Sequence, residues 1–437
     1  MEKIDYIVLG DYVLTMNHAL ETIRDGAVAV KDGKISEVGE SKTLLKKYDA
    51  KTVIGGTDRA VLPGLINTHT HAAMVYFRGL ADDLPLKDWL EGHIWPAEAR
   101  WLSPQFVSDA VELACLEMLK AGVTTFCDMY FYTGSTAAAS RKMGLRAVVG
   151  AGIVDFPTVS GKGADDYLAN AEQFISEWKN DELITPCIAP HSTYACGPET
   201  LKKVRTVADR NGVMMQIHLS ETEWEVNEII SKQGKRPVKY LEALGFLDGR
   251  VIASHCVRLD AGEIETLARM KVGVSHCLES NLKLASGIAP VPEMLKAGVK
   301  VSFGTDGAAS NNDLSILSEM STAAKVHKAV TGDPTAMNAK TVLLMATRSG
   351  AEVLGLGDKT GSLEKGKHAD IITLDLRKPH LVPLYDIYSH LAYTATSADI
   401  ESVLIGGRLL IDKKVALACN EEEIIKKARK WGDKIRL

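Results

Sequence analysis

Eight apolar, strand-like runs alternate with helical stretches between about residues 61 and 355 of this 437-residue chain. Strand and helix units that alternate in this number predict an α/β fold, a parallel sheet closed into a (β/α)8 TIM-like barrel of roughly 250 to 300 residues. The predicted strands are Val61–Thr70, Val123–Met129, Arg146–Val154, Ile184–Pro190, Val213–Leu219, Val251–His255, Val272–His276 and Val301–Gly304.

Both ends of the chain have a β texture instead. Residues 1–60 contain short β-like runs, and Asp32-Gly33 is a strong hairpin signal because both residues tolerate the positive φ of a type I′ turn. Similar runs return after about residue 360, with Gly406-Gly407 as a turn. Neither end has enough strands to bury a sheet face alone. The expected division is therefore a small composite β-sandwich of residues 1–60 and 360–419, a barrel of residues 61–359 and a C-terminal helix of residues 420–437.

The composition excludes several classes of function. The net charge is −5 with no long Lys/Arg run, which is not the charge pattern of a nucleic-acid binder. The sequence has no run of about 18 apolar residues for a membrane span, and acidic residues stand near the N-terminus where a secretory signal is basic. The seven cysteines form no C-x-x-C pair, so free thiols are expected. We expect a cytoplasmic protein that acts on a small molecule.

Two histidines, His69 and His71, stand at the end of the first predicted strand. Residues two apart on a strand point to the same side, so both imidazoles are expected at the carboxyl-end mouth of the barrel. On its own, this pair is as compatible with a chance surface arrangement as with half of a metal site.

Other polar residues follow the remaining predicted strands. Side chains at the carboxyl ends of different barrel strands converge on the active site, whereas core positions are apolar. These residues are His191 after the fourth strand, His218 at the end of the fifth with Glu221 three residues on, His255 at the end of the sixth and Asp306 after the eighth. A purely structural reason for all of them is improbable.

Three imidazoles and one carboxylate suit one divalent metal ion per chain, with Zn²⁺ first and Fe²⁺ or Mn²⁺ also acceptable. The expected ligands are His69, His71, His218 and Asp306. Such an ion lowers the pKa of a bound water toward about 7. Asp306 is expected to accept a proton from that water and Glu221 to deliver one to the substrate, while His255 stabilises developing charge. The structural alternatives are a core histidine for His255 and a helix N-cap for Asp306.

Several motifs carry a resemblance to known enzymes. They are PGLINTHTH at 63–71, IHLSET at 217–222, SHC at 254–256, SNLKL at 280–284 and GTDGAASNN at 304–312. The chain resembles the amidohydrolase superfamily, and more narrowly the S-adenosylhomocysteine/5′-methylthioadenosine deaminase family, over essentially its whole length. The resemblance implies a hydrolase acting on a cyclic amidine C–N bond, which converts an adenosine-type nucleoside to its inosine analogue and ammonia.

The resemblance also implies substrate contacts. It assigns Glu98 to the ribose hydroxyls and His191 to the nucleoside base. Some relatives carry an arginine after the third strand for the homocysteine carboxylate, and Ala151 aligns there, while Arg146 is expected to pack behind the strand. Without that bidentate partner, S-adenosylhomocysteine is less favoured than 5′-methylthioadenosine, adenosine or 5′-deoxyadenosine.

Alternatives remain at this point. A deaminase or dechlorinase of another ring, such as guanine, a pterin or an s-triazine, would use the same metal ligands. A non-catalytic barrel scaffold would not need those ligands. A nucleic-acid-editing deaminase would need a P-C-x-x-C motif, which the chain lacks. The region 187–191 has no lysine to bridge two metals, which favours one ion. The sequence leaves open whether the protein forms homo-oligomers.

Overall fold

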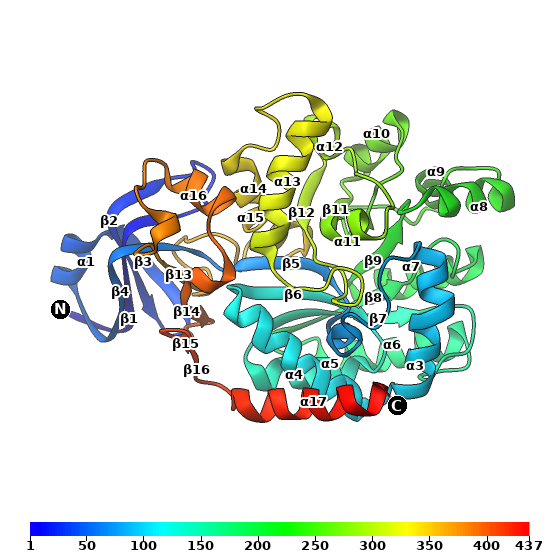
Figure 1. Cartoon of the computed structure of the whole chain (residues 1–437), viewed down its shortest axis with the longest axis horizontal. Helices are drawn as coiled ribbons and strands as arrows, with labels where there is room; N and C mark the ends of the chain where they lie inside the picture. The colour runs from blue at the N-terminus through cyan, green and yellow to red at the C-terminus, as the bar shows by residue number, and fades with distance from the viewer. Residues whose placement is uncertain (437) are drawn as a thin grey trace.

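A barrel and a smaller sheet lie side by side in this protein (Figure 1). The computed structural model describes residues 1–436. The barrel strands follow one another in sequence order, and each pairs in parallel with the next. They are β5 (Leu65–Thr70), β6 (Val123–Tyr130), β7 (Arg146–Ile153), β8 (Ile184–Pro190), β9 (Met214–Leu219), β10 (Val251–His255), β11 (Gly273–His276) and β12 (Lys300–Phe303). The expected (β/α)8 barrel is confirmed.

Hydrogen bonds between the first and last strands close the barrel. The Thr68 hydroxyl of β5 donates to the carbonyl oxygen of Phe303 at the end of β12 (2.9 Å). The backbone N–H of Asp306 donates to the carbonyl oxygen of His69 (3.0 Å). All four residues are buried. The closure therefore places Asp306 directly beside the histidine pair of β5.

The first barrel strand begins later than the sequence pattern indicated. Residues 61–63 belong to β4 (Tyr48–Pro63) of the smaller sheet, and β5 starts at Leu65. Gly64 separates the two strands, and a Cβ atom there would lie 1.9 Å from Thr124 Oγ1. One apolar run thus serves two sheets, because only glycine allows the chain to pass this close to β6.

Helices cover the outside of the barrel. Helix α4 (Pro104–Lys120) shows typical start signals: Ser103 accepts a hydrogen bond from the N–H of Phe106, and Pro104 occupies the first turn. A segment of short helices precedes it and lies over the barrel mouth: η1 (Ala72–Phe77), α2 (Leu86–Trp89), η2 (Leu90–Ile94) and α3 (Trp95–Trp101). The other barrel helices are α4 (Pro104–Lys120), α5 (Thr133–Met143), α6 (Ala164–Trp178), α7 (Pro198–Asn211), α8 (Glu223–Gln233), α9 (Pro237–Ala243), α10 (Ala261–Met270), α11 (Leu278–Lys283), α12 (Val291–Lys296), α13 (Ile316–Thr331), α14 (Ala339–Met345) and α15 (Arg348–Val353).

Strands from both chain ends pair in the smaller sheet, in the order β16-β15-β14-β13-β4-β1-β2-β3. The predicted turns are confirmed, since Asp32, Gly33, Gly406 and Gly407 all have positive φ. The remaining strands are β1 (Glu2–Leu14), β2 (Thr22–Lys31), β3 (Lys34–Glu40), β13 (Ile371–Asp375), β14 (Ile400–Ile405), β15 (Arg408–Asp412) and β16 (Val415–Ala416). Helix α1 (Ser41–Lys47), η3 (Pro379–Leu381), α16 (Ile387–Tyr393) and η4 (Ser397–Asp399) connect them.

The last helix, α17 (Glu421–Arg436), runs along the barrel beneath α4 (Figure 1). Its Trp431 packs edge-on against Phe106 with ring centroids 5.1 Å apart, and the indole N–H donates to Asp109 (3.1 Å). Among residues 1–436, none of the helices is long and apolar enough to cross a membrane.

Candidate active site

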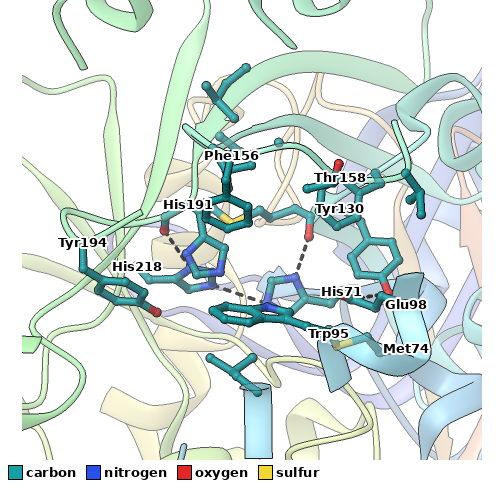
Figure 2. Close-up of a pocket in the computed structure, with 18 of the residues that line it drawn as sticks. His71, Met74, Trp95, Glu98, Tyr130, Phe156, Thr158, His191, Tyr194 and His218 are labelled. Atoms are coloured by element: carbon teal, nitrogen blue, oxygen red, sulfur yellow. Dashed lines mark hydrogen bonds between the residues drawn. The ribbon is translucent and has the colours of Figure 1, made fainter. Parts of the chain in front are cut away.

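The strand ends predicted to carry function meet in one pocket of ≈ 270 Å³ at the barrel mouth. Figure 2 shows His71, His218, His191 and Glu98 around it. His71 follows β5, His218 lies in β9, and α3 brings Glu98 in from the segment above the mouth. His255 and Asp306, from β10 and the loop after β12, also line the pocket.

Three imidazoles form its centre. One potential ligand atom from each of His69, His71 and His218 lies within 4.8 Å of the other two. Backbone carbonyls orient two of the rings: His71 Nδ1 lies 2.5 Å from Met129 O, and His218 Nδ1 lies 2.7 Å from His191 O. The Nε2 atoms of these rings face each other at 3.3 Å. A ring that donates from Nδ1 to a carbonyl presents a lone pair on Nε2, which is the form that binds a metal.

Asp306 completes the cluster with one oxygen. Its Oδ1 lies 3.4 Å from His69 Nε2 and 3.2 Å from His71 Nε2. Its Oδ2 accepts hydrogen bonds from Ser280 Oγ and Ser310 Oγ, both at 2.7 Å. Burial opposes ionisation of Asp306, yet the imidazoles of His69 and His71 beside its Oδ1 hold its pKa well below the usual range. The two serines thus fix an ionised carboxylate with its other oxygen toward the imidazoles.

These groups fit a divalent cation. His69 Nε2 is fully buried and has no hydrogen-bond partner among the described residues, and such an orphan polar atom in a protein interior calls for a ligand. Three imidazole nitrogens and a carboxylate oxygen are a donor set that Zn²⁺ accepts. Cys277, which follows β11, is also near: its potential ligand atom lies within 4.8 Å of those of His69 and His255. The sequence alone did not indicate this proximity.

Glu221 and His255 stand next to this cluster. His255 Nε2 lies 3.7 Å from Glu221 Oε2. Burial, with a smaller contribution from the charge of Asp306, raises the pKa of Glu221 well above its usual range. Burial also lowers the pKa of His255 to about 3, and His255 Nδ1 lies 3.0 Å from the Asn281 amide. The surroundings therefore favour the protonated form of the Glu221 carboxyl beside an uncharged His255 imidazole.

Glu98 and His191 occupy other walls of the pocket. The hydroxyl of Tyr130 donates to Glu98 Oε1 (2.7 Å), and burial raises the pKa of Glu98 to about 7. Burial lowers the pKa of His191 to about 3, and its ring centroid lies 4.6 Å from that of His218. A carboxyl group and a neutral imidazole thus face the same small cavity.

Ala151 does not line the pocket, although Gly152 and Ile153, which follow it on β7, do. Arg146 lies elsewhere: its guanidinium forms a buried pair with Asp370 (3.0 and 3.2 Å). Neither residue therefore offers a contact to a bound molecule in the cavity.

Comparison with known proteins identifies the family of this chain. The profile of the Amidohydrolase family matches residues 60–410. The chain belongs to the amidohydrolase family. It is 56% identical, over 99% of both chains, to a 5-methylthioadenosine/S-adenosylhomocysteine deaminase of Thermodesulfovibrio yellowstonii. It is 46% identical to a 5′-deoxyadenosine deaminase of Methanosarcina acetivorans, over 99% of this chain and 98% of the relative.

Solved structures show the same relationship. An adenosine deaminase from Xanthomonas campestris with bound zinc superimposes with a TM-score of 0.98 at 39% identity, covering 100% of this chain and 99% of that one. The predicted deaminase family is therefore confirmed, and this amidohydrolase is a hydrolytic deaminase that shares its architecture with a zinc-containing enzyme.

Some residues of the site had no predicted role. Ser280, Asn281 and Ser310 stand inside the motifs that carry the family resemblance, but nothing in their local sequence shows that they contact Asp306 or His255. Tyr130, the partner of Glu98, ends an apolar strand and reads as a core residue. Ser310 is only four residues from Asp306, but the other pairs are brought together only by the fold.

Proposed function

We propose that the protein deaminates adenosine-type nucleosides by hydrolysis at C6, releasing ammonia and the inosine analogue. The observation that carries this proposal is the convergence of three imidazoles and Asp306 in a pocket that also presents Glu221 and Glu98. The names of the relatives, which are deaminases of 5′-methylthioadenosine, S-adenosylhomocysteine and 5′-deoxyadenosine, support the same substrate class.

The ion in this proposal is Zn²⁺, one per chain. His69, His71, His218 and Asp306 would hold it, with donor types that zinc accepts, and the related adenosine deaminase contains zinc. When bound, a divalent ion supplies Lewis acidity and lowers the pKa of a coordinated water to about 7.

The protein side chains would handle the protons. Burial raises the pKa of Glu221 and favours its protonated form, so its carboxyl would donate to the ring nitrogen next to the carbon that bears the amino group. Asp306 Oδ1 would accept the proton that the attacking water loses. His255, neutral and 3.7 Å from Glu221, would hydrogen-bond the oxygen where charge develops.

Glu98 and His191 would position the substrate. Two ribose hydroxyls would donate to Glu98, whose Oε1 is already held by Tyr130. His191 is a neutral imidazole and would hydrogen-bond the purine. The proposed binding partners are thus small-molecule substrates. A cytoplasmic location and homo-oligomeric assembly stay predictions.

The test compares nucleosides with free bases. We expect kcat/KM for adenosine and 5′-deoxyadenosine, followed by ammonia release, to exceed that for adenine by about 10²-fold or more, because adenine leaves the buried Glu98 carboxyl without the two ribose hydroxyls. Glu98→Ala should reduce this preference, and Glu91→Ala, an exposed carboxylate on the same segment, should not. A preference for adenine, guanine or an s-triazine would refute the proposal.

A further inference from the structure

The pocket has no cation for a charged substituent. Among its described lining residues there is no Lys or Arg, whereas three carboxyl groups line it: Glu98, Glu221 and Asp306. A carboxylate brought in with a substrate would therefore find no lysine or arginine to pair with in the cavity.

Aromatic and aliphatic side chains form the outer wall. The loop after β7 contributes Phe156, Pro157 and Val159, and α3 contributes Trp95. The rings of Trp95 and Phe156 lie 6.0 Å apart between centroids, and Figure 2 shows both beside the imidazoles. Phe156 is 41% exposed, so its ring has surface free for contact with a bound molecule.

The loop that carries this wall is held in place. The Tyr167 hydroxyl of α6 lies within 3.1 Å of the Phe156 carbonyl, the Gly161 carbonyl and Thr158 Oγ1. The Tyr132 hydroxyl donates to the carbonyl of Val159 (2.9 Å). The wall is therefore arranged before a substrate binds, which lowers the entropy cost of using it.

The stereochemistry of a nucleoside directs its 5′ group. In a β-nucleoside the base and C5′ project from the same face of the ribose, and the two hydroxyls project from the other face. With the base at the imidazoles and the hydroxyls at Glu98, C5′ points away from Glu98. The walls that remain on the outer side are the uncharged residues of the β7 loop and Trp95.

We propose that Trp95 and Phe156 bind the 5′ substituent and select an uncharged one, with a methylthio group preferred over the zwitterionic homocysteine tail. This inference rests on the proposed nucleoside deaminase function. A thioether sulfur makes favourable contacts with aromatic rings. At this wall the homocysteine carboxylate would lose hydration without gaining a partner among the residues that line the pocket.

The experiment measures kcat/KM for 5′-methylthioadenosine, 5′-deoxyadenosine, adenosine and S-adenosylhomocysteine with the unmodified enzyme, Phe156→Arg and Phe156→Leu. We expect the unmodified enzyme to favour 5′-methylthioadenosine over S-adenosylhomocysteine by about 10-fold or more. Phe156→Arg supplies the missing cation and should shift this ratio toward S-adenosylhomocysteine by about 10-fold. Phe156→Leu removes the ring without adding charge, so it should lower kcat/KM for 5′-methylthioadenosine only.

The outcomes distinguish a failure of this inference from a failure of the proposed deaminase function. If S-adenosylhomocysteine equals or exceeds 5′-methylthioadenosine in the unmodified enzyme, the selection by this wall is refuted while deamination of nucleosides stands. An unchanged ratio in Phe156→Arg refutes the placement of the 5′ group at Phe156. If none of the four nucleosides is deaminated, the proposed function itself fails.

Discussion

At the scale of single residues, the groups that contact Nδ1 of each imidazole, on the side away from the cluster, fix the orientation of the ring. His71 and His218 each face a backbone carbonyl through Nδ1, and His69 Nδ1 lies 3.0 Å from the Gln216 amide. These contacts orient the rings toward a common point, and such contacts tune metal affinity in metalloenzymes.

Removing an imidazole should remove the metal. We expect His69→Ala or His218→Ala to lose both bound metal and deaminase activity, because either leaves three protein ligands. His18→Ala is the matched control, since that histidine is exposed in the turn between β1 and β2. Elemental analysis and ammonia release measure the two quantities, and stoichiometric metal in His69→Ala would contradict the ligand assignment.

Glu221 should be needed for chemistry but not for the metal. Glu221→Gln removes the carboxyl proton that burial favours, so we expect kcat to fall by about 10²-fold or more, the scale of a general acid. Metal content should remain at the level of the unmodified protein. Loss of metal in this variant would make Glu221 a ligand instead.

The ionised form of Glu98 should lower the free energy of unfolding at high pH. Its pKa is raised to about 7 in the folded protein, above its ordinary value in the unfolded chain, so the folded state holds the proton more tightly and stability falls as pH rises toward 7. Glu98→Gln keeps an acceptor for Tyr130 and removes the charge. In metal-free protein we expect it to raise the free energy of unfolding by about 3 kcal/mol at about pH 8 and by much less near pH 5. Urea denaturation at both pH values measures this, and an equal gain at both would contradict it.

At the scale of elements, the seam between β5 and β12 positions the cluster. Asn67 of β5 accepts from the Thr305 N–H (3.1 Å) and donates to the Thr305 hydroxyl (2.8 Å). Thr305 directly precedes Asp306, so this side chain aligns the carboxylate with the histidines of β5.

Loosening that seam should weaken the metal site. We expect Asn67→Ala to lower metal affinity by about 10- to 100-fold, the range for residues that support ligands. Asn338→Ala is the control: it removes the side chain that caps the N-terminus of α14, so it should lower stability and leave metal affinity unchanged. Competition with a chelator gives both affinities, and equal affinities in the two variants would show that Asn67 does not position Asp306.

At the scale of the whole molecule, a buried ion pair joins the barrel to the smaller sheet. Arg146 begins β7, and Asp370 precedes β13 and also accepts from the N–H of Gly406 (2.7 Å). Both side chains are almost fully buried. We infer that the barrel, from Leu65 to about residue 359, forms one structural unit and residues 1–63 with 360–419 a second, linked at this pair.

Breaking the pair should destabilise the protein. Arg146→Met leaves Asp370 buried and unpaired, so we expect a loss of about 3 to 5 kcal/mol in the free energy of unfolding. Arg141→Met removes a pair whose guanidinium is exposed, and should cost less than about 1 kcal/mol. Denaturant titration measures both. Adding Asp370→Asn to Arg146→Met should recover part of the loss; similar losses for the two single variants would contradict a role for the buried pair.

The sequence by itself determined the order of the barrel strands, the two turns with positive φ and the residues at the strand ends, because periodicity and turn chemistry are local properties of the chain. It also placed His69, His71, His218 and Asp306 as one candidate set through the rule that strand ends converge. Only the tertiary structure decided that Gly64 divides one apolar run between two sheets, that Ser280 and Ser310 hold Asp306, and that Phe156 and Trp95 share one wall. Apart from the contact of Ser310 with Asp306, which lies four residues before it, each of these depends on contacts between residues far apart in the chain, and no local pattern records which distant side chains the closed barrel brings into reach.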